Sequence, residues 1–513
     1  MTLAVLASCA LTGFSAVPVR VEVHLAPGLP SVQVVGLPDA EVRESRERVR
    51  AAIVNSGFVF PPGRLTINLA PADLPKESGR FDLPIALGIL LASGQLVLPE
   101  VTSRRAEERP QLADHVFAGE LSLTGALVPV RGALAIALSV ASSGSRTLVL
   151  PTGSAHEAAH VPQLTVYQAA TLADVVAHLA GGQQLEAVPA SVVPRALSPY
   201  PCLSDVRGQP EARRAVEVAA AGFHNLLMSG PPGAGKSMLA QRLPGLLPPL
   251  PHAQALEVAA LHRLFHDTPA PFGQRPFRAP HHSASVAALV GGGPQARPGE
   301  ISLAHHGVLF LDELPEFDRR VLEALREPLE TGAISVSRAQ VRAEYPARFQ
   351  LVAAMNPCPC GWLGHPRRRC TCTPDQVARY RARLSGPLLD RIDLHVELPA
   401  PGSAWLDAAP GETTAVVARR VALAWQRQHE RQGTVNSALG ATQLARHCAL
   451  SDGARELWRK AIERLDWSTR TAHRIVKVAR TVADLDAAEV IQAHHVAEAI
   501  QYRCRLQPTG QDA

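Results

Sequence analysis

One glycine-rich segment constrains the fold of this 513-residue chain more than any other feature. It fits the pattern G-x-x-x-x-G-K-[ST] and consists of Gly230, Pro231, Pro232, Gly233, Ala234, Gly235, Lys236 and Ser237. An apolar run suited to a buried parallel strand precedes it at 225–229, and a helical pattern follows it from Met238 to Leu243. Because strand, glycine loop and helix occur in this order, the segment predicts a phosphate-binding loop (P-loop) in an α/β fold.

The residues of the P-loop have distinct expected roles. Glycines allow backbone N–H groups to converge on phosphate oxygens, and the start of the following helix adds partial positive charge. Lys236 is expected to reach the β- and γ-phosphates, and Ser237 is expected to bind Mg²⁺. The chain has only four lysines, so a chance match to this pattern is rare. We therefore expect ATP and Mg²⁺ to bind here, the alternative being a flexible glycine turn.

A second segment carries the acidic groups that a nucleotide site needs. Val308–Leu311 is an apolar run that is followed by two acids, Asp312 and Glu313. At the carboxyl end of a strand, Asp312 is expected to hold the Mg²⁺ shell, and Glu313 can polarise the attacking water. This is Walker B chemistry. The alternative is a buried strand followed by an acidic turn, and the P-loop upstream disfavours it.

Two residues that follow predicted regular elements are further candidates. Phe349–Met355 is predicted to be a strand that ends at Asn356, whose amide can help to place the water (sensor 1) or can start an Asn-Pro turn. Arg391 is predicted at the end of a helix, where it can reach across a subunit boundary into a neighbour's ATP as an arginine finger. The alternative for Arg391 is a pair within the subunit, with Asp390 or Asp393.

Four parts follow one another along the chain. Residues 1–182 alternate strand-like and helical runs, 183–203 read as a proline-rich linker, 204–401 form the α/β part with the P-loop, and 402–513 are helical. In this helical lid Arg470 opens a helix and can aim its guanidinium at the γ-phosphate (sensor 2). Helical patterns cover 40–53, 83–91, 415–432, 451–464, 468–484 and 487–502.

Composition indicates a globular protein without a membrane segment. No apolar run reaches the roughly 18 residues that a membrane helix needs. Residues 1–10 lack a basic n-region and lead directly into strand-like alternation, so we expect a first strand rather than a signal peptide, and a cytoplasmic location. The net charge of +5 permits nucleic-acid binding without arguing for it.

Four of the eight cysteines stand close together in the sequence, in a C-x-C-x₉-C-x-C pattern: Cys358, Cys360, Cys370 and Cys372. Four thiolates can close a tetrahedral Zn²⁺ site, although C-x-C is tighter than the usual C-x₂-C. The alternatives are a metal-free, redox-labile loop and ordinary loop cysteines. The doublets 281–282 and 305–306 are His-His pairs, for which we expect hydrogen bonds within loops, because adjacent residues on a strand point to opposite faces.

An alternating segment just before the predicted sensor strand resembles one arm of a hairpin. Residues 334–342 carry Arg338 and Arg342, which are candidates for sequence-independent contacts with DNA phosphates. The alternative is a solvated hairpin face.

With these residues the chain resembles the ComM/YifB family of magnesium-chelatase-like AAA+ ATPases, and the resemblance extends nearly from end to end. The segments that carry it are more specific than the P-loop: 277–283 (FRAPHHS), 297–301 (RPGEI), 355–361 (MNPCPCG), 478–485 (VARTVADL) and 498–503 (EAIQYR). The resemblance implies an AAA+ P-loop core with a helical C-terminal lid, and a homo-oligomer, a hexameric ring. It also implies a helicase-type motor that moves along single-stranded or branched DNA and supports branch migration in natural transformation (competence).

The first part of the chain resembles the Lon-protease fold (ribosomal S5 domain 2-like), most closely at residues 68–77. Lon-type proteolysis needs a serine after such a segment and a lysine about fifty residues later. Ser78 is not at the matching place, and residues 129–134 contain no lysine. We expect a scaffold or partner surface here and no protease activity.

Two other functions compete with a DNA motor. One is the ATPase motor subunit of a magnesium-chelatase-like complex, and the other is a protein-remodelling unfoldase. The Lon-like first part favours the DNA motor over the chelatase subunit, and the missing Ser/Lys pair disfavours an unfoldase with its own protease.

Overall fold

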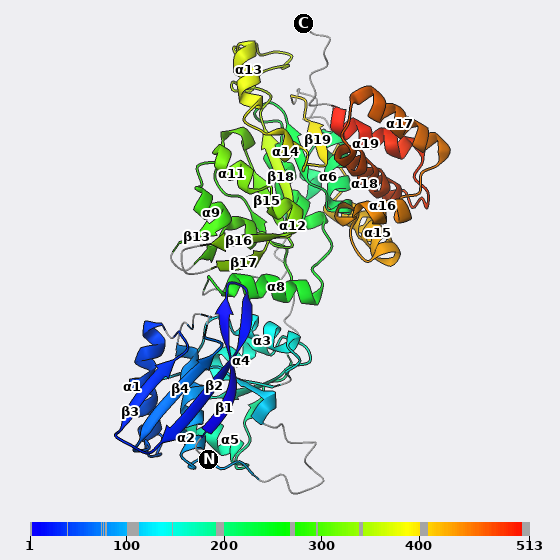
Figure 1. Cartoon of the computed structure of the whole chain (residues 1–513). Helices are drawn as coiled ribbons and strands as arrows, with labels where there is room; N and C mark the ends of the chain where they lie inside the picture. Colours follow the sequence, from blue (N-terminus) through cyan, green and yellow to red (C-terminus); the bar gives the residue numbers. More distant parts are fainter. Residues whose placement is uncertain are drawn as a thin grey trace. The chain divides into compact units, whose positions relative to one another are not determined.

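The structure is a computed structural model. It describes residues 3–37, 39–72, 74, 76, 79–99, 112–145, 147–190, 200–266, 272–293, 296–337, 342–400 and 409–504. The chain divides into two compact units (Figure 1). Unit 1 comprises residues 1–196, 252–272 and 342–344, and unit 2 comprises residues 197–251, 273–341 and 345–513.

Unit 1 is built on an eight-stranded mixed sheet with the order β10-β9-β8-β5-β1-β2-β4-β3. The strands are β1 (Leu3–Thr12), β2 (Ser15–Ala26), β3 (Ser31–Val35), β4 (Arg64–Ala70), β5 (His115–Phe117), β8 (Thr147–Pro151), β9 (Thr165–Ala169) and β10 (Glu186–Ala187). β1 and β2 form a long antiparallel hairpin, which confirms the first strand predicted from the sequence. β10 lies inside the range predicted as a linker and pairs with β9.

The helices of unit 1 are α1 (Ala40–Asn55), α2 (Asp82–Ala92), α3 (Ala133–Ser142), α4 (Thr152–Ala158), α5 (Leu172–Leu179) and α8 (His252–Arg263). Every residue of α2 is buried, because this apolar helix packs against β1 and β2 in the core. α8 belongs to unit 1 although it follows the P-loop in sequence, and it buries Leu256 and Ala260 beside α3. A short ribbon, β6 (Glu120–Leu121) and β7 (Leu127–Val128), completes the unit.

Unit 2 contains a five-stranded parallel sheet with the order β12-β15-β18-β11-β19. The strands are β11 (Leu226–Ser229), β12 (Phe277–Arg278), β15 (Val308–Leu311), β18 (Gln350–Met355) and β19 (Leu394–Glu397). β11, β15 and β18 are buried along their whole length, as expected for parallel strands covered on both faces. A mixed α/β fold with a parallel sheet is therefore confirmed.

The helices around this sheet are α6 (Pro210–Gly222), α7 (Lys236–Arg242), α9 (Val286–Val290), α10 (Glu300–Leu303), α11 (Arg319–Ala324), α12 (Pro328–Thr331), α13 (Pro374–Arg381) and α14 (Gly386–Leu389). Two short ribbons are formed by β13 (Gly291–Gly292) with β14 (Arg297–Pro298), and by β16 (Ala333–Ser337) with β17 (Arg342–Pro346). Residues 342–344 of β17 belong to unit 1. Short 3-10 helices lie at Gly79–Phe81, Leu112–Asp114, Leu203–Asp205, Leu243–Leu246, Leu314–Glu316 and Asn436–Ala438.

The C-terminal part is helical, as predicted, and appears in orange to red in Figure 1. It contains α15 (Thr414–Gln432), α16 (Ala441–His447), α17 (Asp452–Leu465), α18 (Thr469–Leu485) and α19 (Ala493–Cys504). The prediction that the last helix begins at 487 was wrong. Ala487 has a φ of +57°, and Ile491 pairs with Leu450 in an isolated bridge, so the chain turns before α19 starts. α16 was not predicted from the sequence.

Among the residues that the structure describes, no helix combines the length and the apolar character needed to cross a membrane.

Candidate functional site

The P-loop connects the end of β11 to the start of α7. Gly233 and Gly235 have φ values of +78° and +94°, a left-handed conformation that a side chain rarely allows. Gly235 is the N-cap of α7, and Lys236 is the first residue of that helix. The strand, glycine loop and helix predicted from the sequence are therefore confirmed.

The Lys236 ammonium group is buried inside the P-loop. Its Nζ donates hydrogen bonds to the carbonyl oxygens of Gly230 at 2.6 Å and Pro231 at 3.1 Å, and to Oδ1 of Asn356 at 3.1 Å. Burial lowers the pKa of Lys236, and the nearby Asp312 carboxylate acts in the opposite direction. The structure thus brings together two predicted site residues that are 120 positions apart in the sequence.

Ser237 and Asp312 also meet at this edge of the sheet. The hydroxyl Oγ of Ser237 donates to Oδ2 of Asp312 at 2.6 Å, and Oδ1 of Asp312 accepts the backbone N–H of Glu313 at 2.9 Å. Hydroxyl and carboxylate oxygens are the hard ligands that Mg²⁺ prefers. This donor set fits Mg²⁺, and Ser237 and Asp312 are the residues that would hold it.

Glu313 is in contact with a histidine that the sequence did not connect to the site. Oε2 of Glu313 lies 2.9 Å from Nδ1 of His282, and both side chains are partly exposed. Glu313 has a φ of +53°, a left-handed backbone conformation that is uncommon for a residue with a side chain. From the sequence we expected only loop hydrogen bonds for His282. Its position after β12, the edge strand beside β15, is the signal that a topology prediction could have used.

These groups share one edge because the strands are parallel. β11, β15 and β18 end at the P-loop, at Asp312 and at Asn356 respectively, and their carboxyl ends lie on the same side of the sheet. In open parallel sheets, ligands bind beyond the carboxyl ends of the strands. A cavity of about 1260 Å³ opens beside the P-loop. Its lining includes Val206, Gly208, Met238, His365, Arg381 and Leu398.

Arg391 lies at the other end of the strands, beside their amino ends. It precedes β19, whose first residue Leu394 is in register with Leu226, the first residue of β11. The side chain is buried and bonded within the chain: it donates to the carbonyl oxygens of Arg326 and Pro387, and NH2 lies 2.8 Å from Oε2 of Glu330. The predicted alternative partners, Asp390 and Asp393, are therefore not the ion-pair partner of Arg391 here.

Arg470 reaches the same place from α18. Its NH2 lies 2.6 Å from Oε1 of Glu330, so one carboxylate joins Arg391 and Arg470. One turn later on α18, Arg474 forms an ion pair with Asp393, just before β19. In this structure Arg470 is therefore paired with Glu330, and its sensor-2 role stays a prediction. Nothing in the sequence singled out Glu330.

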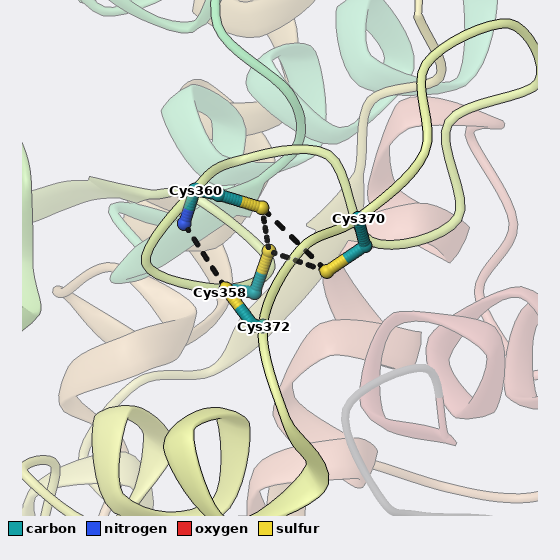
Figure 2. Close-up of side chains that lie close together, drawn as sticks. All are labelled: Cys358, Cys360, Cys370 and Cys372. Atoms are coloured by element: carbon teal, nitrogen blue, oxygen red, sulfur yellow. Dashed lines mark hydrogen bonds between the residues drawn. The ribbon is translucent and has the colours of Figure 1, made fainter.

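The four cysteines gather as the spacing predicted (Figure 2). The Sγ atoms of Cys358, Cys360 and Cys370 are 3.4–3.7 Å apart, and Sγ of Cys372 accepts the backbone N–H of Cys360 at 3.4 Å. All four sulfurs lie within 4.8 Å of one another. A hydrogen bond with the backbone of Thr371 lowers the pKa of Cys360, whereas the pKa of Cys370 and that of Cys372 are raised.

The cysteine loop also touches the P-loop. A methyl group built on Gly361 would lie 2.7 Å from Cδ of Pro232, so these two segments are in close contact.

Of the two arginines predicted to contact DNA, Arg338 lies outside the described residues. Arg342 is the first residue of β17, in the ribbon with β16, and its side chain is not described.

Three family profiles match the chain and together span most of it. Residues 202–404 match the family described as "Magnesium chelatase, subunit ChlI", residues 21–154 match "Subunit ChlI of Mg-chelatase", and residues 411–503 match "Magnesium chelatase, subunit ChlI C-terminal".

Individual relatives are similar over almost their full length. The chain is 47% identical to the "Competence protein ComM" of Haemophilus influenzae over 518 residues, which covers 99% of this chain and 98% of that protein. It is also 47% identical to the "Uncharacterized protein YifB" of Escherichia coli, covering 98% and 97%. A shorter stretch, 40% of this chain, is 23% identical to 25% of the "Maternal DNA replication licensing factor mcm6" of Xenopus tropicalis.

Proposed function

This chain belongs to the ComM/YifB family of magnesium-chelatase-like proteins, and we propose that it is an ATP-hydrolysing AAA+ ring motor that acts on DNA. The observation that carries the proposal is the meeting of Lys236, Ser237, Asp312 and Asn356 at the carboxyl edge of one parallel sheet. A cationic lysine, a hydroxyl, a carboxylate and an amide in this arrangement match what phosphoryl transfer requires.

ATP binding follows from the groups around the P-loop. We assign the phosphates to the glycine-rich side of the 1260 Å³ cavity and the base to its apolar side, near Val206, Met238 and Leu398. Lys236 would exchange its two carbonyl contacts for phosphate oxygens, since the ammonium group attracts an anionic oxygen more strongly than a neutral carbonyl oxygen. When bound by Ser237 and Asp312, Mg²⁺ neutralises charge on the phosphate oxygens.

Hydrolysis also needs a group that orients water. Glu313 follows the Mg²⁺ ligand Asp312 and is the carboxylate best placed to polarise the water, and Asn356 lies beside Lys236 on the next strand. The imidazole of His282 holds the Glu313 carboxylate at 2.9 Å, so His282 acts as a positioning residue.

The arginines support an oligomeric motor. Arg391 and Arg470 lie at the amino edge of the sheet, whereas the P-loop of the same chain lies at the carboxyl edge. Both guanidinium groups can therefore complete only the nucleotide site of a neighbouring copy. An arginine finger of this kind contributes about 10³–10⁵ to the rate in other NTPases. A closed ring, a hexamer by resemblance to the family, satisfies every site.

The proposal that DNA is the partner rests on the names of the relatives and on the ribbon formed by β16 and β17. One relative is named a competence protein and another a DNA replication licensing factor. We assign Arg338 and Arg342 to phosphate contacts with single-stranded or branched DNA. We assign the activity to branch migration in recombination or natural transformation, and we place it in the cytoplasm.

We further propose the part boundaries 1–182, 183–203, 204–401 and 402–513, with a Lon-protease-like, non-proteolytic first part.

The deciding experiment is ATP hydrolysis by the full-length protein with single-stranded, duplex and branched DNA. We expect DNA to stimulate hydrolysis severalfold and Lys236→Ala to abolish hydrolysis with and without DNA. If none of the three forms of DNA stimulates hydrolysis, the DNA motor is refuted, and a magnesium-chelatase-type subunit or an unfoldase remains.

We also propose that the cysteine cluster holds one Zn²⁺. With Zn–S bonds of about 2.3 Å, the sulfurs of a tetrahedral site are about 3.8 Å apart. The three measured separations of 3.4–3.7 Å are close to this value, and a set of four sulfurs suits zinc. Metal analysis of the purified protein should give about one zinc per chain. Cys372→Ser should lower this content and Cys202→Ser, outside the cluster, should not, whereas a zinc-free wild-type protein would rule the site out.

A further inference from the structure

Glu330 is the residue that joins the two predicted arginines, and no part of the nucleotide site uses it. It lies on α12, and its two carboxylate oxygens contact two different guanidinium groups: Oε2 is 2.8 Å from Arg391 and Oε1 is 2.6 Å from Arg470. The two arginines come from the core and from α18, 79 positions apart (470 − 391), so the contact is made only by the folded chain.

Glu330 lies against the guanidinium group of Arg391, which other hydrogen bonds already hold in place. Only 6% of the Arg391 side chain is exposed, whereas the Glu330 side chain is 40% exposed. The Nε and NH1 groups of Arg391 donate to the carbonyl oxygens of Arg326 and Pro387, which leaves NH2 directed at the carboxylate. Glu330 is therefore the solvent-facing partner of the Arg391 guanidinium.

The hydrogen bond with Arg391 lowers the pKa of Glu330, which favours the charged carboxylate. A carboxylate with two oxygens in contact with two guanidinium groups has the same chemistry as two phosphate oxygens in that place. The cluster is thus an anion site that an internal anion already fills.

We propose that Glu330 occupies the position of a neighbouring chain's nucleotide phosphate, and that it must leave before Arg391 and Arg470 act on that nucleotide. This inference rests on the proposed function and adds a competitor at the arginine site. Glu330 also lies three residues before β16, the ribbon strand assigned to DNA, so movement of the ribbon would move the competitor.

The test uses two full-length variants that are inactive alone. Lys236→Ala chains cannot bind ATP productively but still donate their arginines, and Arg391→Ala chains bind ATP but lack the finger. Mixing them should restore ATP hydrolysis, with the Lys236→Ala chain as donor. We then add Glu330→Gln, which keeps the size of the side chain and removes its charge, to the donor or to the acceptor.

We expect Glu330→Gln in the donor to lower the donor concentration that gives half-maximal hydrolysis. Because 40% of the Glu330 side chain is exposed to solvent, which screens its charge, we expect a change of roughly two- to fivefold. The same substitution in the acceptor should have no effect. Glu327→Gln, an exposed carboxylate on the same helix turn, is the matched control and should behave as the parent donor. Glu330→Ala, with thermal unfolding to check the fold of each variant, should act in the same direction as Glu330→Gln.

The outcomes separate the two proposals. If mixing restores hydrolysis but Glu330→Gln leaves the donor concentration unchanged or raises it, Glu330 does not compete and this inference fails alone. If no mixture hydrolyses ATP, the arrangement in which neighbours complete each other's sites fails, and this inference fails with it.

Discussion

Gly361→Ala tests whether the cysteine loop supports the P-loop. Gly361 follows Cys360 and has a φ of +82°. A methyl group on it would lie 2.7 Å from Cδ and 2.9 Å from Cγ of Pro232, closer than real Cβ contacts come. Because Pro232 is a rigid ring inside the P-loop, the loop itself must shift to accommodate the methyl group.

The expected cost has two parts. Placing alanine in a left-handed conformation costs about 1–2 kcal/mol. Forcing an extra methyl group into a packed contact costs about 1–3 kcal/mol more. Gly433→Ala is the matched control, because Gly433 has a φ of +73° and nothing within 4 Å of the added Cβ, at the end of α15. The difference between the two variants isolates the contact with the P-loop.

The assay is ATP affinity together with thermal unfolding of the full-length protein. Both variants should unfold at lower temperature, but only Gly361→Ala should bind ATP more weakly. If the 1–3 kcal/mol of the contact is lost from binding, the dissociation constant rises about 5- to 150-fold. Equal ATP affinity in the two variants would show that the cysteine loop does not support the P-loop.

Other predictions concern stability and pH. Asp484→Asn removes the carboxylate that Arg431 contacts at 2.6 Å and Arg480 at 3.0 Å, and should lower the free energy of unfolding in urea by about 3–5 kcal/mol, since buried cations lose their partner; a loss below 1 kcal/mol would contradict this. Burial lowers the pKa of His395 to about 3, so its protonation favours the unfolded chain. The stability that neutral His395 contributes is complete above about pH 6.5 and should fall by up to about 1.4 kcal/mol per pH unit below that value, a slope that His395→Gln should reduce. If the cysteine cluster holds zinc as proposed, a chelator should lower the unfolding temperature of the wild-type protein and leave that of Cys372→Ser unchanged.

The elements of the candidate nucleotide site could be predicted because each is continuous in the sequence. The P-loop lies between its strand and its helix, and Asp312 and Asn356 each follow an apolar run that becomes a buried strand. Parallel strands then place the three ends at one edge without further information. The cysteine cluster was predictable for the same reason, since all four residues lie within fifteen positions, 358 to 372.

What the sequence could not provide is the pairing of residues that meet only in the folded chain. Glu330 contacts Arg470 across 140 positions, and an exposed glutamate on a short helix carries no pattern that marks it. His282 contacts Glu313 because β12 lies next to β15 in the sheet, and the strand order is not encoded locally. The late start of α19 was missed because the turn at Ala487 is made by an alanine with positive φ, a residue type that predicts helix.

The distribution of charge between the two edges of the sheet has a consequence for assembly. β11 has four residues, so its first and last Cα atoms are roughly 10 Å apart at about 3.3 Å per residue. Lys236 and Asp312 stand at one end, and Arg391 is held at the other by carbonyl oxygens and Glu330. Within one chain, Arg391 therefore cannot reach the P-loop unless these contacts break. In the proposed oligomer, the copy that supplies the arginine must present a different surface from the one it meets, which is a head-to-tail interface, and such interfaces either close into rings or continue as filaments. If hydrolysis depends on Arg391, closure is the arrangement in which no nucleotide site lacks its arginine.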